Sequence, residues 1–157
     1  LGEKLHVVLT RRRADLRRHA GEISFPGGRS EREDGDLEQT ALREAEEEIG
    51  LPSANVSVLG QLVPVSTFVT GYLIHPFVGL IPETRSWTPS PREVDAVIEL
   101  ALEELPRSRK RTILERRGFS FETDAYVLGE HLIWGATARI LENLLERLQP
   151  LLGDHTG

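Results

Sequence analysis

The feature that most constrains this chain is a helix whose two ends and charged face can be located in the sequence. Asp36 is a suitable N-cap, and Gln39 three residues later completes a capping-box arrangement. Gly50 permits the backbone conformation that commonly ends a helix, and Pro52 prevents its continuation. The sequence therefore predicts a helix over Leu37–Ile49, with an apolar stripe formed by Ala41, Leu42, Ala45 and Ile49.

Three glutamates of the predicted helix share one face. Glu44, Glu47 and Glu48 stand at positions i, i+3 and i+4, whereas Glu46 points elsewhere. Like charges at this spacing repel one another, and the repulsion costs more when the carboxylates are partly buried. A divalent cation such as Mg²⁺, which prefers hard oxygen ligands, removes that penalty. A solvated acidic helix is the ordinary alternative.

The remaining elements are short strands and one further helix. The clearest element is an amphipathic helix over Ala136–Leu148. A helical turn is predicted at Leu102–Leu105, followed by a basic loop, and further loops cover residues 11–21, 29–35 and 82–91. Strands are expected at His6–Leu9, Ile23–Phe25, Val56–Val65, Tyr72–Ile81, Val94–Leu100, Phe119–Phe121 and Tyr126–Leu128. The irregular order of strands and helices predicts a single α+β domain over residues 1–157.

Charge is distributed unevenly along the chain. The whole sequence has 19 basic and 25 acidic residues, a net charge of −6, which disfavours a general nucleic-acid-binding role. Residues 1–29 are nevertheless predominantly basic, and residues 30–50 are predominantly acidic. This arrangement suits a site that handles a phosphate ester together with a divalent cation, although two solvated faces would give the same pattern.

Several classes of protein are excluded or disfavoured by composition. The sequence contains no cysteine, which excludes a thiol nucleophile, a disulfide framework and a cysteine-ligated zinc site. No apolar run approaches the roughly 20 residues of a membrane helix. The first residues show no signal-peptide pattern. We therefore expect a cytoplasmic protein with neither a membrane nor a nucleic-acid partner.

The segment from Gly28 to Leu51 resembles the Nudix box, whose pattern is G-x5-E-x7-R-E-U-x-E-E-x-G-U with U aliphatic. Its second half matches at Arg43, Glu44, Glu47, Glu48, Gly50 and Leu51, with Ala45 a small residue for its position. The first half departs from the pattern, because Asp34 replaces the expected glutamate and the spacing to Arg43 is one residue longer. The resemblance implies an α/β/α sandwich with a mixed sheet, and metal-dependent hydrolysis with Mg²⁺ or Mn²⁺ as cofactor.

A second resemblance narrows the substrate. The stretch upstream of the box is similar to the signature of the coenzyme A pyrophosphatases of the Nudix superfamily, roughly L-L-T-x-R-[SA]-x3-R-x3-G-x3-F-P-G-G. Arg13 occupies the position where that signature has a small residue. The residues in register are Arg12, Arg17, Gly21 and the run Phe25, Pro26, Gly27 and Gly28. Cleavage of the coenzyme A pyrophosphate to 3′,5′-ADP and 4′-phosphopantetheine is the implied reaction.

The resemblance also implies roles for individual residues. Glu44 and Glu48 are the expected direct metal ligands, Glu47 is a third ligand or holds bridging waters, and Gly28 belongs to the metal site. Arg43 is expected to orient a carboxylate. The general base is left open between Glu47 and Glu93. Substrate contacts are expected from Arg12, Arg17, Phe25 and Gly27.

Two other functions remain open at this point. The first is a Nudix pyrophosphatase that acts on ADP-ribose or another nucleoside diphosphate derivative. The second is a Nudix domain without catalytic activity that binds a nucleotide. A lost glutamate in the helix would mark that second group, and all three are present here. The sequence is equally compatible with a monomer and a homodimer.

Overall fold

Strand β1 (His6–Arg12) is the centre of the first sheet, with β2 (Ile23–Ser24) on one side and β7 (Val94–Ala101) on the other. The computed structural model describes residues 4–16, 21–67, 71–83 and 86–152. The three strands predicted in this sheet are confirmed, but β1 extends three residues further, so Arg11 and Arg12 do not belong to a loop. Pairing explains the extension, because the Arg12 N–H donates to the Glu22 carbonyl at 2.9 Å.

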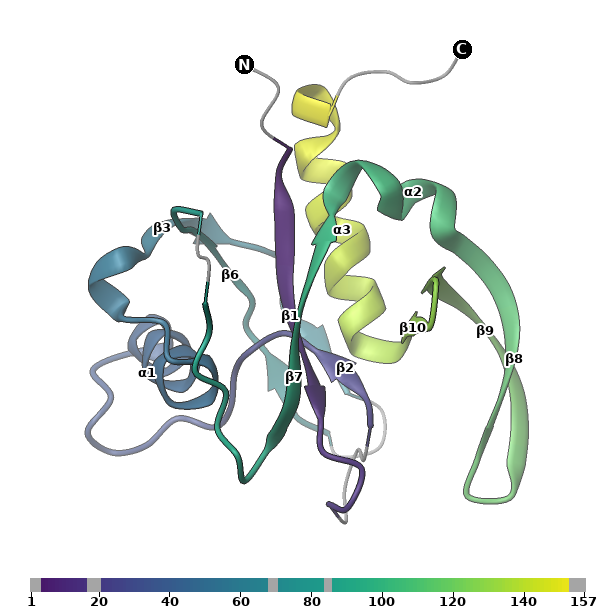
Figure 1. The fold of residues 1–157 in the computed structure, drawn as a ribbon, viewed down its shortest axis with the longest axis horizontal. Helices are drawn as coiled ribbons and strands as arrows, with labels where there is room; N and C mark the ends of the chain where they lie inside the picture. Colours follow the sequence, from purple (N-terminus) through teal and green to yellow (C-terminus); the bar gives the residue numbers. More distant parts are fainter. Residues whose placement is uncertain (1–3, 17–20, 68–70, 84–85, 153–157) are drawn as a thin grey trace.

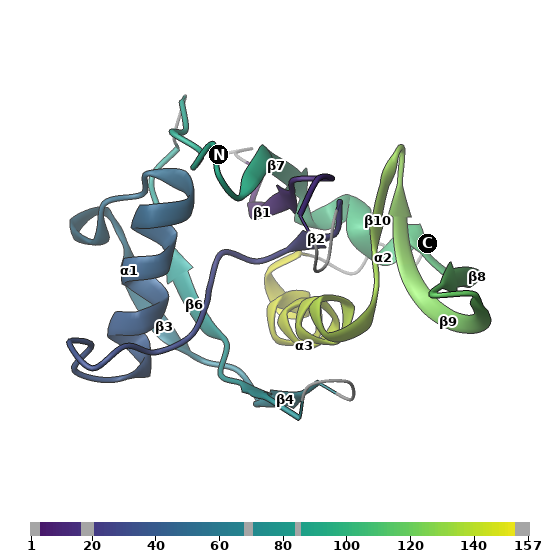
Figure 2. The same cartoon turned by 90° about the horizontal axis from the view of Figure 1, so that it is seen from below.

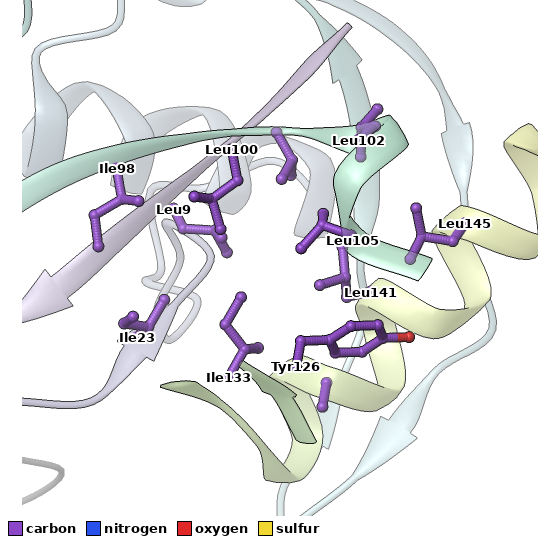
Figure 3. Close-up of a cluster of buried hydrophobic side chains, with 12 residues drawn as sticks. Leu9, Ile23, Ile98, Leu100, Leu102, Leu105, Tyr126, Ile133, Leu141 and Leu145 are labelled. Carbon is purple, nitrogen blue, oxygen red and sulfur yellow. The ribbon is translucent and has the colours of Figure 1, made fainter. Parts of the chain in front are cut away.

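The main core lies between this sheet and helix α3 (Gly135–Leu152), as Figure 3 shows. Val7 and Leu9 alternate along one face of β1, and Leu141 of α3 is fully buried in the same cluster. The predicted amphipathic helix is therefore confirmed and extends beyond both predicted ends. The other buried members are Ile23, Ile98, Leu100, Leu102, Leu105, Tyr126, Ile133, Ala138 and Leu145.

A long antiparallel hairpin occupies the region where the sequence predicted a basic loop. After the turns η2 (Leu102–Glu104) and α2 (Leu105–Ser108) come β8 (Arg109–Arg116), β9 (Phe119–Leu128) and β10 (His131–Ile133). The loop prediction was wrong, because two arginines of β8 pair with carboxylates on neighbouring elements. Arg109 donates to Glu142 of α3 at 2.8 Å, and Arg111 lies 3.5 Å from Glu122 of β9. The two predicted strands between residues 119 and 128 form one continuous strand.

The middle of the chain forms two small sheets of short strands. The predicted strand over Val56–Val65 is divided into β3 (Ser57–Gln61) and β4 (Val65–Ser66). The predicted strand over Tyr72–Ile81 is divided into β5 (Leu73–Ile74) and β6 (Phe77–Leu80), with Pro76, which has no N–H to donate, between them. β3 pairs with β6, and β4 pairs with β5. Helix α1 (Leu37–Ile49) and the turn η1 (Ser53–Asn55) precede them.

The arrangement of these elements confirms the α+β class. Figure 1 shows α1 at one end of the molecule and the β8–β9 hairpin at the other, with β1, β7 and α3 between them. In Figure 2 the β3–β6 pair lies beside α1. Each strand pair within the described ranges is antiparallel, so the parallel pairing of the expected mixed sheet is not found there. None of the helices in the described ranges combines the length and apolar character that crossing a bilayer requires.

Candidate active site

Helix α1 begins and ends at the residues that the sequence predicted. The Asp36 carboxylate accepts a hydrogen bond from the Gln39 backbone N–H at 2.9 Å, and Gly50 adopts a left-handed φ of 72°. The predicted apolar stripe is only partly buried, because Ile49 and Thr40 are the buried residues of this helix. α1 therefore contributes little to the main core and is positioned mainly by its two ends.

Asp34 anchors the first half of the helix through Arg43. The Arg43 guanidinium donates to both carboxylate oxygens of Asp34, at 2.9 Å from Nε and 3.1 Å from Nη2. The Thr40 hydroxyl and the Glu31 backbone N–H donate to the same carboxylate at 2.9 Å and 2.8 Å. Arg43 and these donors hold the pKa of Asp34 far below its usual range. An aspartate with a shifted spacing therefore makes a complete ion pair at this position.

Arg43 also contacts two of the three predicted metal-ligating glutamates. Its Nη1 lies 3.2 Å from Glu44 Oε1 and 3.1 Å from Glu47 Oε2. The Glu44 side chain is only 15% exposed, whereas that of Glu47 is 58% exposed. Arg43 is thus placed to orient carboxylates, which is what its predicted role requires. Glu47 points toward this arginine near the surface, and Glu44 points inward.

The pKa values of Glu44 and Glu48 are raised. Burial, together with the charges of Glu44 and Glu93, raises the pKa of Glu48 to about 7. Burial also raises the pKa of Glu44, and the charges of Glu47 and Glu93 act in the same direction. Arg12 and a backbone hydrogen bond from Gly27 oppose the rise at Glu48. Partly buried carboxylates that disfavour their own ionisation form a suitable environment for a hard cation.

The Gly27-Gly28 turn passes directly over these carboxylates. A Cβ atom at Gly28 would lie 2.5 Å from Cδ and 2.6 Å from Oε1 of Glu44, so any larger residue there would push the Glu44 carboxylate aside. Gly27 contributes the backbone hydrogen bond to Glu48. Position 28 therefore requires glycine, because only a residue without a side chain lets the backbone approach the Glu44 carboxylate this closely.

A turn at residues 90–94 brings Glu93 to the C-terminal end of α1. The Ser90 N–H donates to the Glu48 carbonyl at 2.7 Å, and the Val94 N–H donates to the Ser90 carbonyl at 2.9 Å. The Thr88 N–H donates to the Ile49 carbonyl at 3.0 Å. These bonds account for the electrostatic effect of Glu93 on Glu48, although the two residues are 45 positions apart in the sequence.

The carboxylates of Glu44 and Glu48 fit a divalent metal by their chemistry, but the three predicted ligands do not yet converge on one point. Glu44 and Glu48 supply hard oxygen atoms, and the space above Glu44 is kept clear by Gly28. Among the residues that the structure describes, however, no three acidic or histidine side chains already converge as a metal site. Coordination by all three glutamates together therefore stays a prediction, with Glu47 the member that points elsewhere.

The predicted substrate contacts are only partly brought together. Arg12 lies near enough to Glu48 to lower its pKa, and Gly27 lies beside the same carboxylate. Phe25 packs against the main core and is partly buried, so only part of its side chain is available to a ligand. Arg17 lies outside the described residues. Sequence reasoning assigned no role to Thr40, whose hydroxyl binds Asp34, and a polar residue next to the predicted apolar stripe was the only signal.

A family model and related sequences both match this chain over most of its length. The sequence model of the family described as "NUDIX domain" matches residues 1–120. The protein "Uncharacterized Nudix hydrolase NudL" of Photorhabdus laumondii is 43% identical over 145 residues, which cover 91% of this chain and 77% of that protein. The protein of the same name from Yersinia enterocolitica is 38% identical over 144 residues, covering 90% and 73% of the two chains.

Solved structures share the fold at low sequence identity. A "MutT/nudix family protein" from Enterococcus faecalis has a TM-score of 0.62 and 19% identity, and the match covers 94% of this chain and 56% of that chain. The "NUDIX domain of Shewanella oneidensis NrtR complexed with ADP ribose" has a TM-score of 0.58 and 17% identity, with 94% and 80% covered. At these identities the likeness establishes the fold.

Proposed function

Because this chain belongs to the Nudix family, we propose that it is a pyrophosphohydrolase that cleaves the diphosphate bond of coenzyme A or one of its derivatives. The products are 3′,5′-ADP and 4′-phosphopantetheine. Family membership supports a hydrolase of this general type. The choice of coenzyme A rests on the upstream signature, in which Arg12 and the Phe25–Gly28 run are in register.

The observation that carries the proposal is the pair of partly buried carboxylates of Glu44 and Glu48 under the Gly27-Gly28 turn, and the pKa of each is raised. Asp34, which binds Arg43 through both oxygens, has a lowered pKa, whereas burial keeps the pKa of Glu44 raised although Arg43 lies 3.2 Å away. Two acidic side chains that are kept close without a cationic partner of equal strength destabilise the protein unless a ligand uses them. This arrangement supports a site for Mg²⁺ or Mn²⁺.

The residues of the chain then have separate roles. Glu44 and Glu48 would hold the metal, which when bound neutralises phosphate charge and makes a water molecule more acidic. Arg43, fixed by Asp34, keeps the Glu44 side chain directed inward. Glu93, whose turn is bonded to the Glu48 carbonyl, would accept a proton from the attacking water, and Glu47 is the alternative base. Of these two, Glu93 is favoured because Glu47 is bound to Arg43.

Arg12 is the described cation best placed for the substrate. It lies near Glu48, so its guanidinium can pair with a phosphate oxygen at the same centre. The net charge of −6 would otherwise repel coenzyme A, which carries several phosphate charges. We place Arg17 and Gly27 with Arg12 as substrate-binding residues, and we place the reaction in the cytoplasm.

A direct comparison of substrates tests the proposal. The purified chain is incubated with coenzyme A, ADP-ribose or a dinucleoside polyphosphate in the presence of Mg²⁺, and kcat/KM is measured for each. Coenzyme A should be preferred, with 3′,5′-ADP as a product. A preference for ADP-ribose would transfer the proposal to that substrate. Turnover of none of the three, with the Glu48→Gln variant binding nucleotide as well as the parent, would favour the non-catalytic alternative.

A further inference from the structure

Arg13 joins the end of β1 to the turn that carries Glu93. Its backbone N–H donates to the Glu93 carbonyl at 2.9 Å, and its Nη1 donates to the Pro91 carbonyl. Both acceptors belong to the turn over residues 90–94. The side chain of Arg13 therefore ties the turn to β1 in addition to the backbone pairing.

The guanidinium of Arg13 is itself held in place. Nε and Nη2 donate to the two carboxylate oxygens of Asp15, at 3.0 Å and 2.6 Å. Three of its donor positions are thus directed by neighbouring acceptors, and the side chain is 39% exposed. A bidentate pair of this kind gives a fixed direction to the remaining Nη1 donor. Lysine, which has a single charged nitrogen, cannot reproduce both contacts.

The turn is anchored at its other end to the metal-binding helix. The Ser90 N–H donates to the Glu48 carbonyl at 2.7 Å, and the Glu93 N–H donates to the Ser90 carbonyl at 3.3 Å. Glu93 therefore lies between two anchors, one on α1 and one on β1. The anchor on α1 is made by backbone atoms. The anchor on β1 includes the Arg13 side chain, which can be removed without altering the backbone bond.

We propose that Arg13 is a positioning residue: by holding the turn over residues 90–94, it keeps the Glu93 carboxylate close to Glu48. This inference rests on the proposed function, in which Glu93 accepts a proton. Arg13 touches neither substrate nor the reacting atoms, and it acts through the turn. A displacement of about 1 Å at a reacting group can lower a rate by up to about a hundredfold, so a loosened turn should affect kcat. Substrate binding by Arg12 should be unaffected.

A double-mutant cycle tests the coupling. Arg13→Ala should lower kcat about tenfold and change KM by less than about twofold. Glu93→Gln removes the base and should lower kcat by about 10² or more. In the Glu93→Gln background, Arg13→Ala should have almost no further effect, because both changes act on one group. Equal effects of Arg13→Ala in the two backgrounds would overturn the proposal.

A second measurement does not depend on catalysis. Hydrogen exchange of the Ser90, Glu93 and Val94 amides should be about fivefold faster in Arg13→Ala, since one side-chain anchor of the turn is lost. Arg13→Lys should give an intermediate rate. The matched control is Arg111→Ala, which removes an arginine paired with carboxylates on the distant β8–β9 hairpin and should leave both exchange and kcat unchanged. Unchanged exchange in Arg13→Ala would overturn the proposal.

Failure of the proposed function would be recognised separately. If the parent chain does not cleave coenzyme A, the cycle is run on whichever diphosphate substrate it cleaves, and the exchange experiment needs no substrate at all. If Arg13→Ala accelerates exchange but Glu93→Gln leaves kcat unchanged, Arg13 still holds the turn but positions no base, and the positioning role is refuted while hydrolysis itself stands.

Discussion

Replacement of Glu48 by glutamine should stabilise the metal-free protein at neutral and alkaline pH. Glu48 is a half-buried carboxylate whose pKa is about 7 in the folded protein, compared with 4.5 for an unperturbed glutamate. A shift of this size corresponds to an upper bound of about 3 kcal/mol. Because Glu48 is only partly buried, screening by solvent reduces the expected effect to about 1–2 kcal/mol.

The sign of the effect follows from proton binding. The folded state holds the Glu48 proton more tightly than the unfolded chain does, so folding loses stability as the pH rises from about 4.5 to about 7. Glutamine is neutral at every pH and does not undergo this loss. The advantage of Glu48→Gln should therefore be small near pH 4.5, grow through this interval and remain constant above it.

The assay is thermal unfolding of both proteins in a chelating buffer between pH 4.5 and pH 8.5. For a chain of 157 residues, the expected stabilisation raises Tm by about 2–8 °C at pH 8. Glu46→Gln is the matched control, because Glu46 is an exposed glutamate of the same helix, and it should show no such pH-dependent gain. Added Mg²⁺ should stabilise the parent more than the variant and so reduce the difference.

The result that would refute this reasoning is a Tm of Glu48→Gln that is equal to, or lower than, that of the parent at pH 8. Such a result would mean that the Glu48 carboxylate is compensated by groups already in the protein. The electrostatic argument for a metal at α1 would then be lost, whatever the activity of the variant.

Other substitutions test the remaining parts of the site. Glu48→Gln should lower kcat about a thousandfold if Glu48 is a direct metal ligand, and a variant within about tenfold of the parent would remove it from the site. Gly28→Ala should weaken Mn²⁺ binding, measured by electron paramagnetic resonance, by about tenfold or more, because its Cβ would displace the Glu44 carboxylate. Asp34→Asn should lower both Tm and kcat because Arg43 loses a charged partner. The loss of stability should be largest above the usual pKa of aspartate, because the pKa of Asp34 is depressed in the folded protein. A loss that does not depend on pH would contradict this. Arg12→Ala should raise KM for coenzyme A more than it lowers kcat, and equal changes would indicate a transition-state role.

Much of α1 was determined by the sequence alone. Asp36, Gln39 and Gly50 act on backbone groups within three or four residues, so their effect depends on local spacing and the structure reproduces both helix ends. The shared face of Glu44 and Glu48 follows from helix geometry in the same way. The amphipathic helix near the C-terminus was predictable for a similar reason, because its apolar period is long and regular.

Tertiary structure decided the features that depend on distant partners. Strand β8 was missed because the charge on Arg109 is balanced by Glu142, 33 residues away. The division of the predicted strands around Pro76 depended on pairing between distant segments, β3 with β6 and β4 with β5. Asp34 can replace a glutamate because the folded chain brings Arg43 within 2.9 Å of it. A glycine is needed at position 28 because the Glu44 carboxylate lies where a Cβ would be. Sequence spacing specifies contacts within a helical turn, whereas contacts between elements exist only once the chain has folded them together.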